Sequence, residues 1–169
     1  MNAVVIYESF WGNTAAVARA VAEGLGPEAR LLSTSEASAE ALAGVDLIVA
    51  GAPVLAFNLS TERIRDGLRT ETGRAPAPPD LSHPLLRIWL ESLPAGSGSC
   101  AAFETRVRGP FGHATKAIVE RLEAAGYRPI SEHGSFVVKG RYGPLRDGEL
   151  DKAREWGAGL AKAMAALLR

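Results

Sequence analysis

The apolar residues of this chain follow two spacings that alternate along its length. Ala3–Tyr7 is a continuous apolar run rich in β-branched residues, which is typical of a strand buried on both faces of a sheet. The next segment, Thr14–Leu25, places apolar residues four apart and ends before Gly26 and Pro27, as a helix with one buried face does. The chain therefore begins with a strand–helix unit of the kind that builds parallel sheets.

The remainder of the chain repeats this alternation. Further strands are predicted at 29–32, 47–50, 100–103 and 136–138, and further helices near 38–42, at 85–93, at 113–125 and from 147 onwards. Five strand signals alternating with five helix signals predict an α/β fold in three layers, a doubly wound five-stranded parallel sheet with helices on both faces. The polar, proline-bearing stretch from Asn58 to Pro84 is predicted to be a long surface loop near a functional region.

Composition narrows the possible classes of protein. The 169 residues are predicted to form a single domain, 1–169, and 19 basic and 19 acidic side chains give no net charge, which argues against a nucleic-acid partner. Cys100 is the only cysteine, and the three histidines share no metal-ligand spacing, so no metal site is expected. No apolar run approaches the roughly 20 residues that span a bilayer. We therefore expect a cytoplasmic protein without a membrane span.

The segment between the first strand and the first helix carries candidate binding chemistry. In Glu8–Thr14, side chains of Ser9, Asn13 and Thr14 can hydrogen-bond, and Gly12 permits a tight turn into the helix. Free amides at a helix N-terminus suit a phosphate group. The alternative interpretation is an ordinary helix cap made by Asn13 or Thr14. Neither the G-x-G-x-x-G pattern of dinucleotide sites nor a P-loop is present at this position.

This segment resembles the first strand and phosphate loop of the flavodoxin family. The family pattern is a hydroxyl residue, any residue, a second hydroxyl residue and then Gly-Asn-Thr. Ser9 and Gly12-Asn13-Thr14 match it, and Trp11 replaces the second hydroxyl residue. Further similar landmarks follow in the family's order: Asp46–Pro53, Phe103–Arg106, Gly143–Leu145 and Gly148-Glu149. The resemblance covers nearly the whole chain and implies the strand order 2-1-3-4-5.

The resemblance also implies a bound FMN. Its phosphate would rest on the loop after the first strand, and its ring would lie between Pro53–Phe57 and Glu104–Gly112. The implied cofactor-binding residues are Ser9, Phe10, Trp11, Gly12, Asn13, Thr14, Pro53, Val54, Leu55, Ala56, Phe57, Glu104, Thr105, Arg106, Gly109 and Gly112. Val54 and Leu55 replace a hydroxyl residue and a histidine or tyrosine that are common in the most similar branch. Stacking on the ring would then come from Phe57, Trp11 or Phe111, unless these side chains only fill the core.

Charged residues near the predicted strand ends allow two interpretations. Glu8 and Glu104 could form an acid/base pair over a ligand, but an ion pair between Glu104 and Arg106 or Arg108 is the simpler interpretation. Arg106 could also place positive charge near the flavin N1 and stabilise the reduced anion. His113 is the first residue of a predicted helix beside this loop. Its side chain is expected either at the surface or near the ligand.

The leading functional hypothesis is an FMN-binding redox protein that transfers electrons, either as a carrier or as a small reductase. A reductase would use NAD(P)H or a quinone, and the partner would be a redox protein or a small-molecule donor or acceptor, bound by a monomer or homodimer. The alternative is a binding or scaffold module with the same fold that has lost, or only weakly retains, flavin. Trp11, Val54 and Leu55 favour the alternative, whereas Ser9 and Gly12-Asn13-Thr14 favour flavin.

Overall fold

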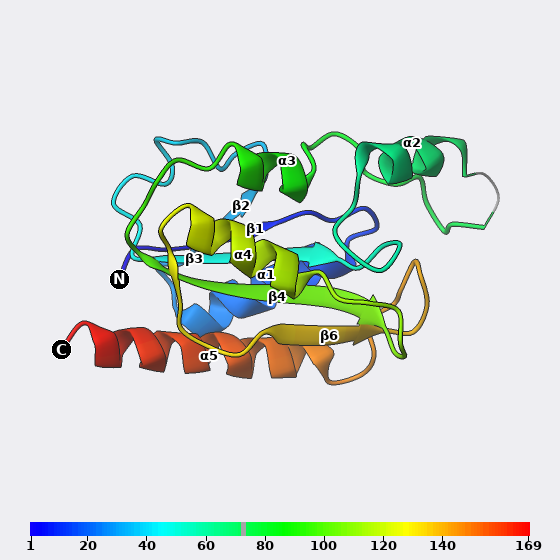
Figure 1. Ribbon diagram of the computed structural model, residues 1–169. Coiled ribbons are helices and arrows are strands. Elements are labelled where there is room, and N and C mark those ends of the chain that lie inside the picture. Colours follow the sequence, from blue (N-terminus) through cyan, green and yellow to red (C-terminus); the bar gives the residue numbers. More distant parts are fainter. Residues whose placement is uncertain (72–73) are drawn as a thin grey trace.

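The computed structural model describes residues 1–71 and 74–169 (Figure 1). Its strands are β1 (Ala3–Tyr7), β2 (Arg30–Ser33), β3 (Leu47–Pro53), β4 (Ser99–Val107), β5 (Arg128–Pro129) and β6 (Gly134–Val138). Its helices are α1 (Asn13–Leu25), α2 (Glu62–Thr70), α3 (Leu86–Glu91), α4 (Thr115–Ala124) and α5 (Glu149–Leu167). Among the described residues, no helix is long and apolar enough to cross a membrane.

The strands form one parallel sheet in the order β2-β1-β3-β4-β5, with β6 also paired to β4. The predicted order 2-1-3-4-5 is confirmed, but two strands share the fifth position. β5 pairs with the start of β4, and β6 pairs with Phe103–Val107 at its end. Pro129, in β5, has no N–H to continue a ladder, and the chain rejoins the sheet only at Gly134. The predicted strand at 136–138 lies within β6.

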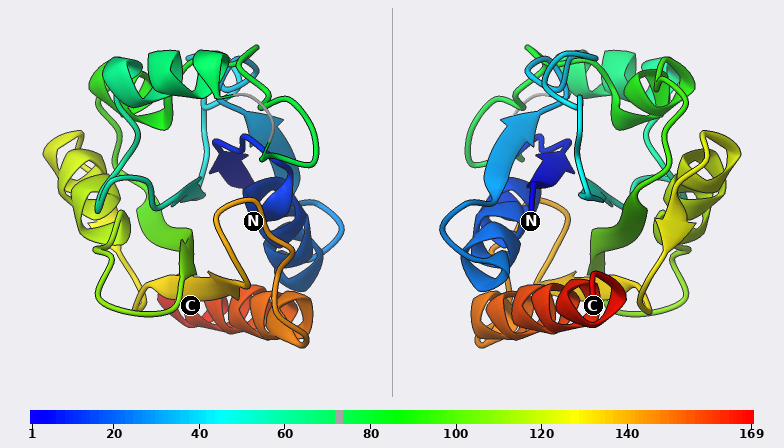
Figure 2. Two further views of the ribbon diagram at one scale, coloured as in Figure 1. Left: turned by 90° about the vertical axis from the view of Figure 1, so that its right-hand side faces the viewer. Right: turned by 90° about the vertical axis from the view of Figure 1, so that its left-hand side faces the viewer.

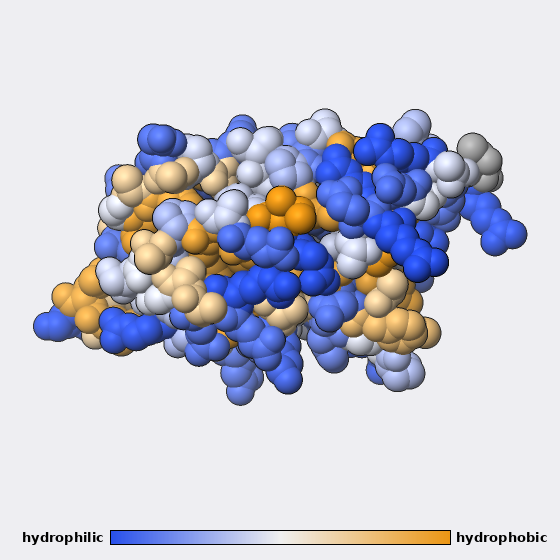
Figure 3. Space-filling view, turned by 45° about the horizontal axis from the view of Figure 1, so that its top comes forward, coloured by the Kyte–Doolittle hydropathy of each residue, from blue (hydrophilic) through white to orange (hydrophobic). Residues whose placement is uncertain are grey.

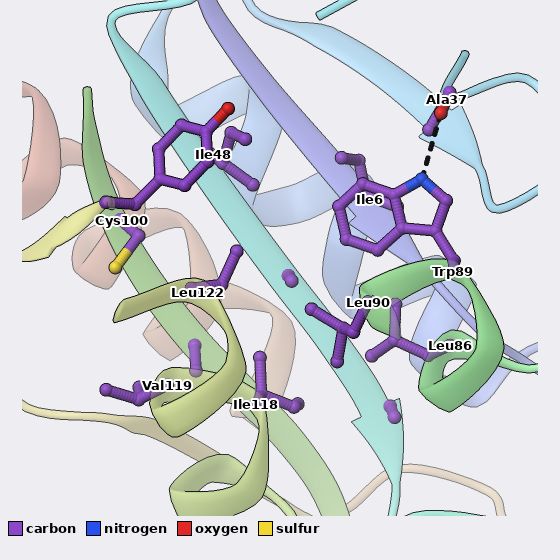
Figure 4. Close-up of a cluster of buried hydrophobic side chains, with 14 of the residues drawn as sticks. Ile6, Ala37, Ile48, Leu86, Trp89, Leu90, Cys100, Ile118, Val119 and Leu122 are labelled. Carbon is purple, nitrogen blue, oxygen red and sulfur yellow. Dashed lines mark hydrogen bonds between the residues drawn. The ribbon is translucent and has the colours of Figure 1, made fainter. Parts of the chain in front are cut away.

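Helices cover both faces of this sheet, so the predicted three layers are confirmed. α1 and α5 lie against one face, and α3 and α4 against the other (Figures 1 and 2). Alternate residues of β1 enter different cores: Val4 and Ile6 face the α3/α4 side, whereas Val5 faces the α1/α5 side. On the α3/α4 side, the indole N–H of Trp89 donates to the carbonyl of Ala37 at 2.9 Å (Figure 4).

α1 and α5 approach each other closely because glycines face the contact. A Cβ on Gly24 would collide with the carbonyl oxygen of Arg154, and one on Gly157 with that of Val21. Larger residues at either position would force the two helix backbones apart. The position of α1, and of the loop that precedes it, therefore depends on α5.

The prediction of a helix near Ser38–Leu42 is wrong. The structure has a series of turns over this segment, with backbone bonds such as Leu42 N–H to the Ser38 carbonyl at 3.1 Å. Most of its side chains are exposed, and a stretch this short has too few buried contacts to stabilise a helix.

The expectation of a continuous surface loop from Asn58 to Pro84 is also wrong, because α2 forms inside it. The Thr61 hydroxyl caps this helix by accepting the N–H of Ile64 at 3.3 Å. Leu68 on its inner face is buried in a small satellite cluster with Phe10 and Leu85. Residues 72 and 73 of the expected loop lie outside the described residues.

Candidate functional site

Two adjoining cavities lie at the carboxyl ends of the strands, where doubly wound sheets bind ligands. The larger, here called the main cleft, has a volume of about 680 Å³, within the roughly 300–1,000 Å³ of small-molecule sites. Its lining residues are Val54, Leu55, Ala56, Phe57, Ile64, Gly67, Glu71, Arg106, Val107, Phe111 and Arg141. The smaller, here called the small pocket, holds about 80 Å³ between the loop after β1 and the ends of β3 and β4. The two share Val54, Leu55, Arg106, Val107 and Arg141.

The loop after β1 forms one wall of the small pocket and leads into α1. Gly12 stands at the N-cap with φ of +88°, in the left-handed region, and donates its N–H to Ser9 Oγ at 3.1 Å. The amides of the first helical turn have no partner within the helix, and that turn carries no acidic residue. This geometry favours an anion at the small pocket.

Trp11 and Asn13 join this loop to two other segments. The Asn13 side-chain amide donates to the carbonyl of Tyr142 at 3.1 Å, and the Trp11 ring meets the Tyr142 ring edge-on at 4.8 Å. The indole N–H of Trp11 donates to Ala77 at 3.2 Å. Phe10, by contrast, turns its side chain into the satellite cluster. Trp11 thus lacks the hydroxyl of the resembled pattern but holds the loop in place.

The segment after β3 forms a strained turn at the edge of the main cleft. Leu55 and Asn58 exchange backbone hydrogen bonds of 3.1 and 3.2 Å, and between them Ala56 and Phe57 have φ of +46° and +70°. Two-residue turns with positive φ favour asparagine and glycine rather than these residues. Gly112 supports the turn, since a Cβ there would collide with the carbonyl of Phe57. Such strain is common at functional sites.

Two large aromatic side chains are exposed in the main cleft. Phe57 is 65% exposed and Phe111 is 48% exposed. Burying a large aromatic side chain is normally favourable. Their exposure beside a cleft is therefore consistent with the binding of a ligand there.

Glu104 is a buried acidic residue within β4. Its buried carboxylate accepts hydrogen bonds from His113 Nδ1 at 2.7 Å, the Ala114 N–H at 2.8 Å and Ser135 Oγ at 3.2 Å. It also lies 3.8 Å from Arg106 Nε, the ion pair that the simpler interpretation expected. Glu104 therefore caps the start of α4 and positions Arg106, and it lines neither cavity.

Glu8 belongs to a separate buried network. Its Oε2 accepts the N–H of Leu86 at 2.6 Å, while Oε1 is buried without a hydrogen-bond partner among the described residues. Burial raises the pKa of Glu8, and hydrogen bonding and the positive charges of Arg65 and Arg87 offset only part of that rise. Glu8 and Glu104 thus each hold the start of a different helix.

Two arginines bring positive charge to both cavities. Arg106 donates to the carbonyl of Gly109, which holds its guanidinium along the loop after β4. Arg141 pairs with Glu71 at 3.2 Å, and the Tyr142 hydroxyl donates to the same carboxylate. The Glu71 contacts join the end of α2 to the loop after β6.

The structure brings most of the predicted site residues together. Those that line one or both cavities are Ser9, Phe10, Trp11, Asn13, Thr14, Pro53, Val54, Leu55, Ala56, Phe57, Thr105 and Arg106. Gly12, Gly109 and Gly112 shape the surrounding loops instead. The sequence analysis missed Ile64, Gly67, Glu71 and Arg141, which line the main cleft. The capping threonine and the four-residue spacing of Ile64 and Leu68 are the signal for α2 that was overlooked.

Comparisons of sequence find no match to any family model and none to a curated protein. Comparison of structures finds many. A flavodoxin from the domain Archaea aligns with a TM-score of 0.65 and 18% identity over 98% of this chain and 99% of its own. Oxidised Flavodoxin 1 from Bacillus cereus aligns with a TM-score of 0.66 and 19% sequence identity, over 95% of this chain and 97% of its own. The flavodiiron core of Flv1 from Synechocystis aligns with a TM-score of 0.65 and 20% sequence identity, over 99% of this chain and 36% of its own.

These similarities extend over almost the whole chain and agree with the observed strand order and the helices on both faces. Identities at this level establish architecture and leave function to be argued from the site. The chain has the flavodoxin-like fold.

Proposed function

We propose that this protein binds FMN and transfers electrons through it. The observation that carries the proposal is the pairing of the two cavities: a small pocket at the N-terminus of α1 opens beside a larger cleft with mostly apolar walls. FMN has matching parts, a phosphate at one end of a flexible chain and a flat ring system at the other. When bound, FMN supplies one- and two-electron redox chemistry.

The donors around the small pocket fit a phosphate group. The Ser9 hydroxyl, the first amides of α1 and the charges of Arg106 and Arg141 all surround this space. Arg106 Nε is buried without a hydrogen-bond partner among the described residues and lies 3.8 Å from the Glu104 carboxylate. A phosphate would place a second negative charge beside this guanidinium.

The walls of the main cleft fit a flat apolar ring. Val54, Leu55 and Val107 offer apolar side chains, and the backbone of the 54–57 turn offers amide and carbonyl groups toward a ring edge. Positive charge from Arg106 would favour a reduced, anionic ring. Solved flavodoxins with the same fold add support at the level of architecture.

The proposed role is electron transfer between the flavin and either a redox protein or a small molecule. Exposure of Phe57 and Phe111 leaves the cleft accessible from solvent, which both a carrier and a small reductase require. The protein's part is to hold the flavin in one orientation, to tune it with nearby charge and to admit its partner.

A visible spectrum after FMN addition and gel filtration tests the proposal. Retained bands near about 450 and about 375 nm, the absorption of oxidised flavin, are expected for the wild-type protein. Absence of retained flavin at saturating FMN would overturn it and leave the scaffold or binding module as the better hypothesis.

Two glycines offer a matched pair of variants for this test. Gly12 and Gly148 both stand at helix N-caps, with φ of +88° and +84°, and no heavy atom of the described residues lies within 4 Å of a Cβ position at either glycine. Gly12→Asp should weaken FMN binding by roughly tenfold or more, because a carboxylate would repel the phosphate. Gly148→Asp carries the same backbone strain at α5 and should retain wild-type affinity.

A further inference from the structure

His113 connects the surface of the molecule to a buried carboxylate. Its side chain is 59% exposed, whereas that of Glu104 is 1% exposed, and His113 Nδ1 lies 2.7 Å from Glu104 Oε1. The other groups bonded to this carboxylate all donate to it: the N–H groups of Ala114 and Thr115 and the hydroxyl of Ser135. Because the carboxylate is the acceptor in these bonds, His113 Nδ1 carries a hydrogen whether the imidazole is neutral or protonated. A second proton, at Nε2, therefore changes the charge of the pair without breaking its hydrogen bond.

The same carboxylate oxygen also faces Arg106. Arg106 Nε lies 3.8 Å from Glu104 Oε1, so one oxygen interacts with both the imidazole and the guanidinium. The Arg106 side chain is 16% exposed and lines both cavities, and its Nε has no hydrogen-bond partner among the described residues. Glu104 therefore balances the charge that Arg106 presents to the cavities when His113 is neutral.

A proton on His113 changes this balance. With a neutral imidazole, Glu104 and Arg106 together carry no net charge. With an imidazolium, His113 and Arg106 compete for the negative charge of Glu104, and the three side chains together carry one positive charge. Histidine side chains commonly gain this proton between about pH 5 and 8. An anion in the small pocket is therefore expected to be attracted more strongly by Arg106 at lower pH.

Other charged groups surround these three residues and set a constant background. They are exposed and lie on every neighbouring segment: Arg108 after β4, Lys116 of α4, Glu132 and His133 before β6, and Lys152 of α5. Figure 3 shows hydrophilic residues beside the grey ones, at the end of the molecule that holds the main cleft. Water and salt screen charges at such exposed positions. His133, a second imidazole in this group, provides a control for His113.

We propose that His113 is a positioning residue whose charge controls, through Glu104, how strongly Arg106 holds an anion in the small pocket. This inference rests on the proposed function, in which the anion is the phosphate of FMN. FMN is held more tightly when His113 is protonated and is released more easily as the pH rises. By linkage, bound FMN in turn favours the protonated imidazole.

The test compares His113→Asn with His133→Gln. Asparagine places an N–H donor near the position of the imidazole Nδ1 but cannot gain a proton, so the bond to Glu104 can persist. Dissociation constants for FMN are measured by fluorescence quenching from about pH 5.5 to 8. The phosphate of FMN itself gains a proton at about pH 6, but this effect is common to all the proteins and cancels in the ratio of their affinities.

The FMN affinity of the wild type relative to His113→Asn should rise roughly three- to tenfold as the pH falls across this range, the size expected for one added charge in a partly solvated site. His133→Gln should follow the wild type at every pH. In an Arg106→Gln background, His113→Asn should lose most of its effect on the pH profile, because the side chain that responds to Glu104 is absent.

A second measurement needs no ligand. In the ligand-free protein, the nuclear magnetic resonance signal of Arg106 Nε should shift with pH across the same range. The shift should disappear in His113→Asn and persist in His133→Gln, because only His113 contacts Glu104.

Parallel pH profiles for the wild type and His113→Asn would overturn the inference, as would an equal effect of His133→Gln. An undiminished effect of His113→Asn in the Arg106→Gln background would also overturn it, since the imidazole charge would then act on the anion directly. An Arg106 signal that does not respond to pH would overturn it without reference to FMN. A wild-type protein that retains no FMN would instead refute the proposed function, and the Arg106 signal would then decide alone whether His113 and Arg106 are coupled.

Discussion

The hydroxyl groups of Thr14 and Thr105 lie 2.7 Å apart at the buried base of the site. Thr14 belongs to the first turn of α1, and Thr105 to the end of β4. Their hydrogen bond therefore joins the loop proposed to hold the phosphate to the strand that leads into the loop beside the ring. The two halves of the candidate site are held at one spacing by this contact.

Thr105→Val should destabilise the fold by about 1–3 kcal/mol, because it leaves the buried Thr14 hydroxyl without a partner. Urea unfolding followed by circular dichroism measures this change. The double variant with Thr14→Val removes both hydroxyl groups and should lose less than the sum of the two single variants. Strict additivity would show that the two hydroxyls do not interact.

Gly112→Ala should move the 54–57 turn, because the new Cβ would collide with the Phe57 carbonyl. We expect a loss of several kcal/mol in stability, above the roughly 1–2 kcal/mol that positive φ alone costs an alanine. Gly148→Ala, with φ of +84° and open space around its Cβ, measures that cost by itself. Equal losses in the two variants would argue against the contact with Phe57.

Glu8 should make stability depend on pH. Burial raises its pKa in the folded state above the value of about 4.5 in the unfolded chain, so the folded state holds this proton more tightly. The resulting stabilisation is complete below the unfolded pKa and is lost as pH rises through the folded pKa. Glu8→Gln, which cannot titrate, should remove this decline.

Urea unfolding of the wild type and Glu8→Gln at several pH values from about 4 upward measures the difference directly. The variant keeps a side-chain oxygen to accept the Leu86 N–H, so its fold is expected to persist. A difference in unfolding free energy that is constant with pH would contradict the raised pKa.

Asn13→Ala should weaken FMN binding by about 1–3 kcal/mol, because the loop after β1 loses the bond between the Asn13 amide and the Tyr142 carbonyl. Calorimetric titration with FMN gives the affinity of each protein. An unchanged affinity would remove the Asn13 side chain from the binding determinants.

Gly67→Ala should stabilise the protein by about 0.5–1 kcal/mol through helix propensity, since none of the residues that the structure describes would obstruct a methyl group there. Gly159→Ala should give a similar gain for the same reason. Thermal unfolding of both variants provides the measurement. Destabilisation at Gly67 alone would mean that the α2 wall is packed more tightly than the structure shows.

Much of the fold could be read from the chain because buried parallel strands leave a plain pattern. β1, β3 and the first part of β4 are covered on both faces by packed helices, so their residues are almost uniformly apolar. The split between β5 and β6 was not visible, since it depends on where the ladder to β4 breaks around Pro129. The helix predicted at Ser38–Leu42 from residue propensity does not form, because few side chains of this segment are buried.

Part of the candidate site could also be predicted from the sequence, because it depends on where the strands end. Loops that directly follow strands were identified because the strand ends place them. Gly67 belongs to α2 and Glu71 follows its last residue. The mixed charges of this segment resemble those of a solvated loop, and Arg141 pairs with Glu71. No local pattern records an interaction between residues so distant in sequence. The capping role of Glu104 depends in the same way on tertiary contacts.

The close packing of α1 on α5 has a consequence for how the molecule matures. α1 leaves the ribosome early, but the helix whose carbonyl groups meet Gly24 is translated long afterwards. Until α5 docks, the apolar face of α1 lacks much of its cover, and the loop that α1 orients is not held in position. The candidate site is thus completed only after translation of α5, and a nascent chain that still lacks α5 is not expected to hold its ligand.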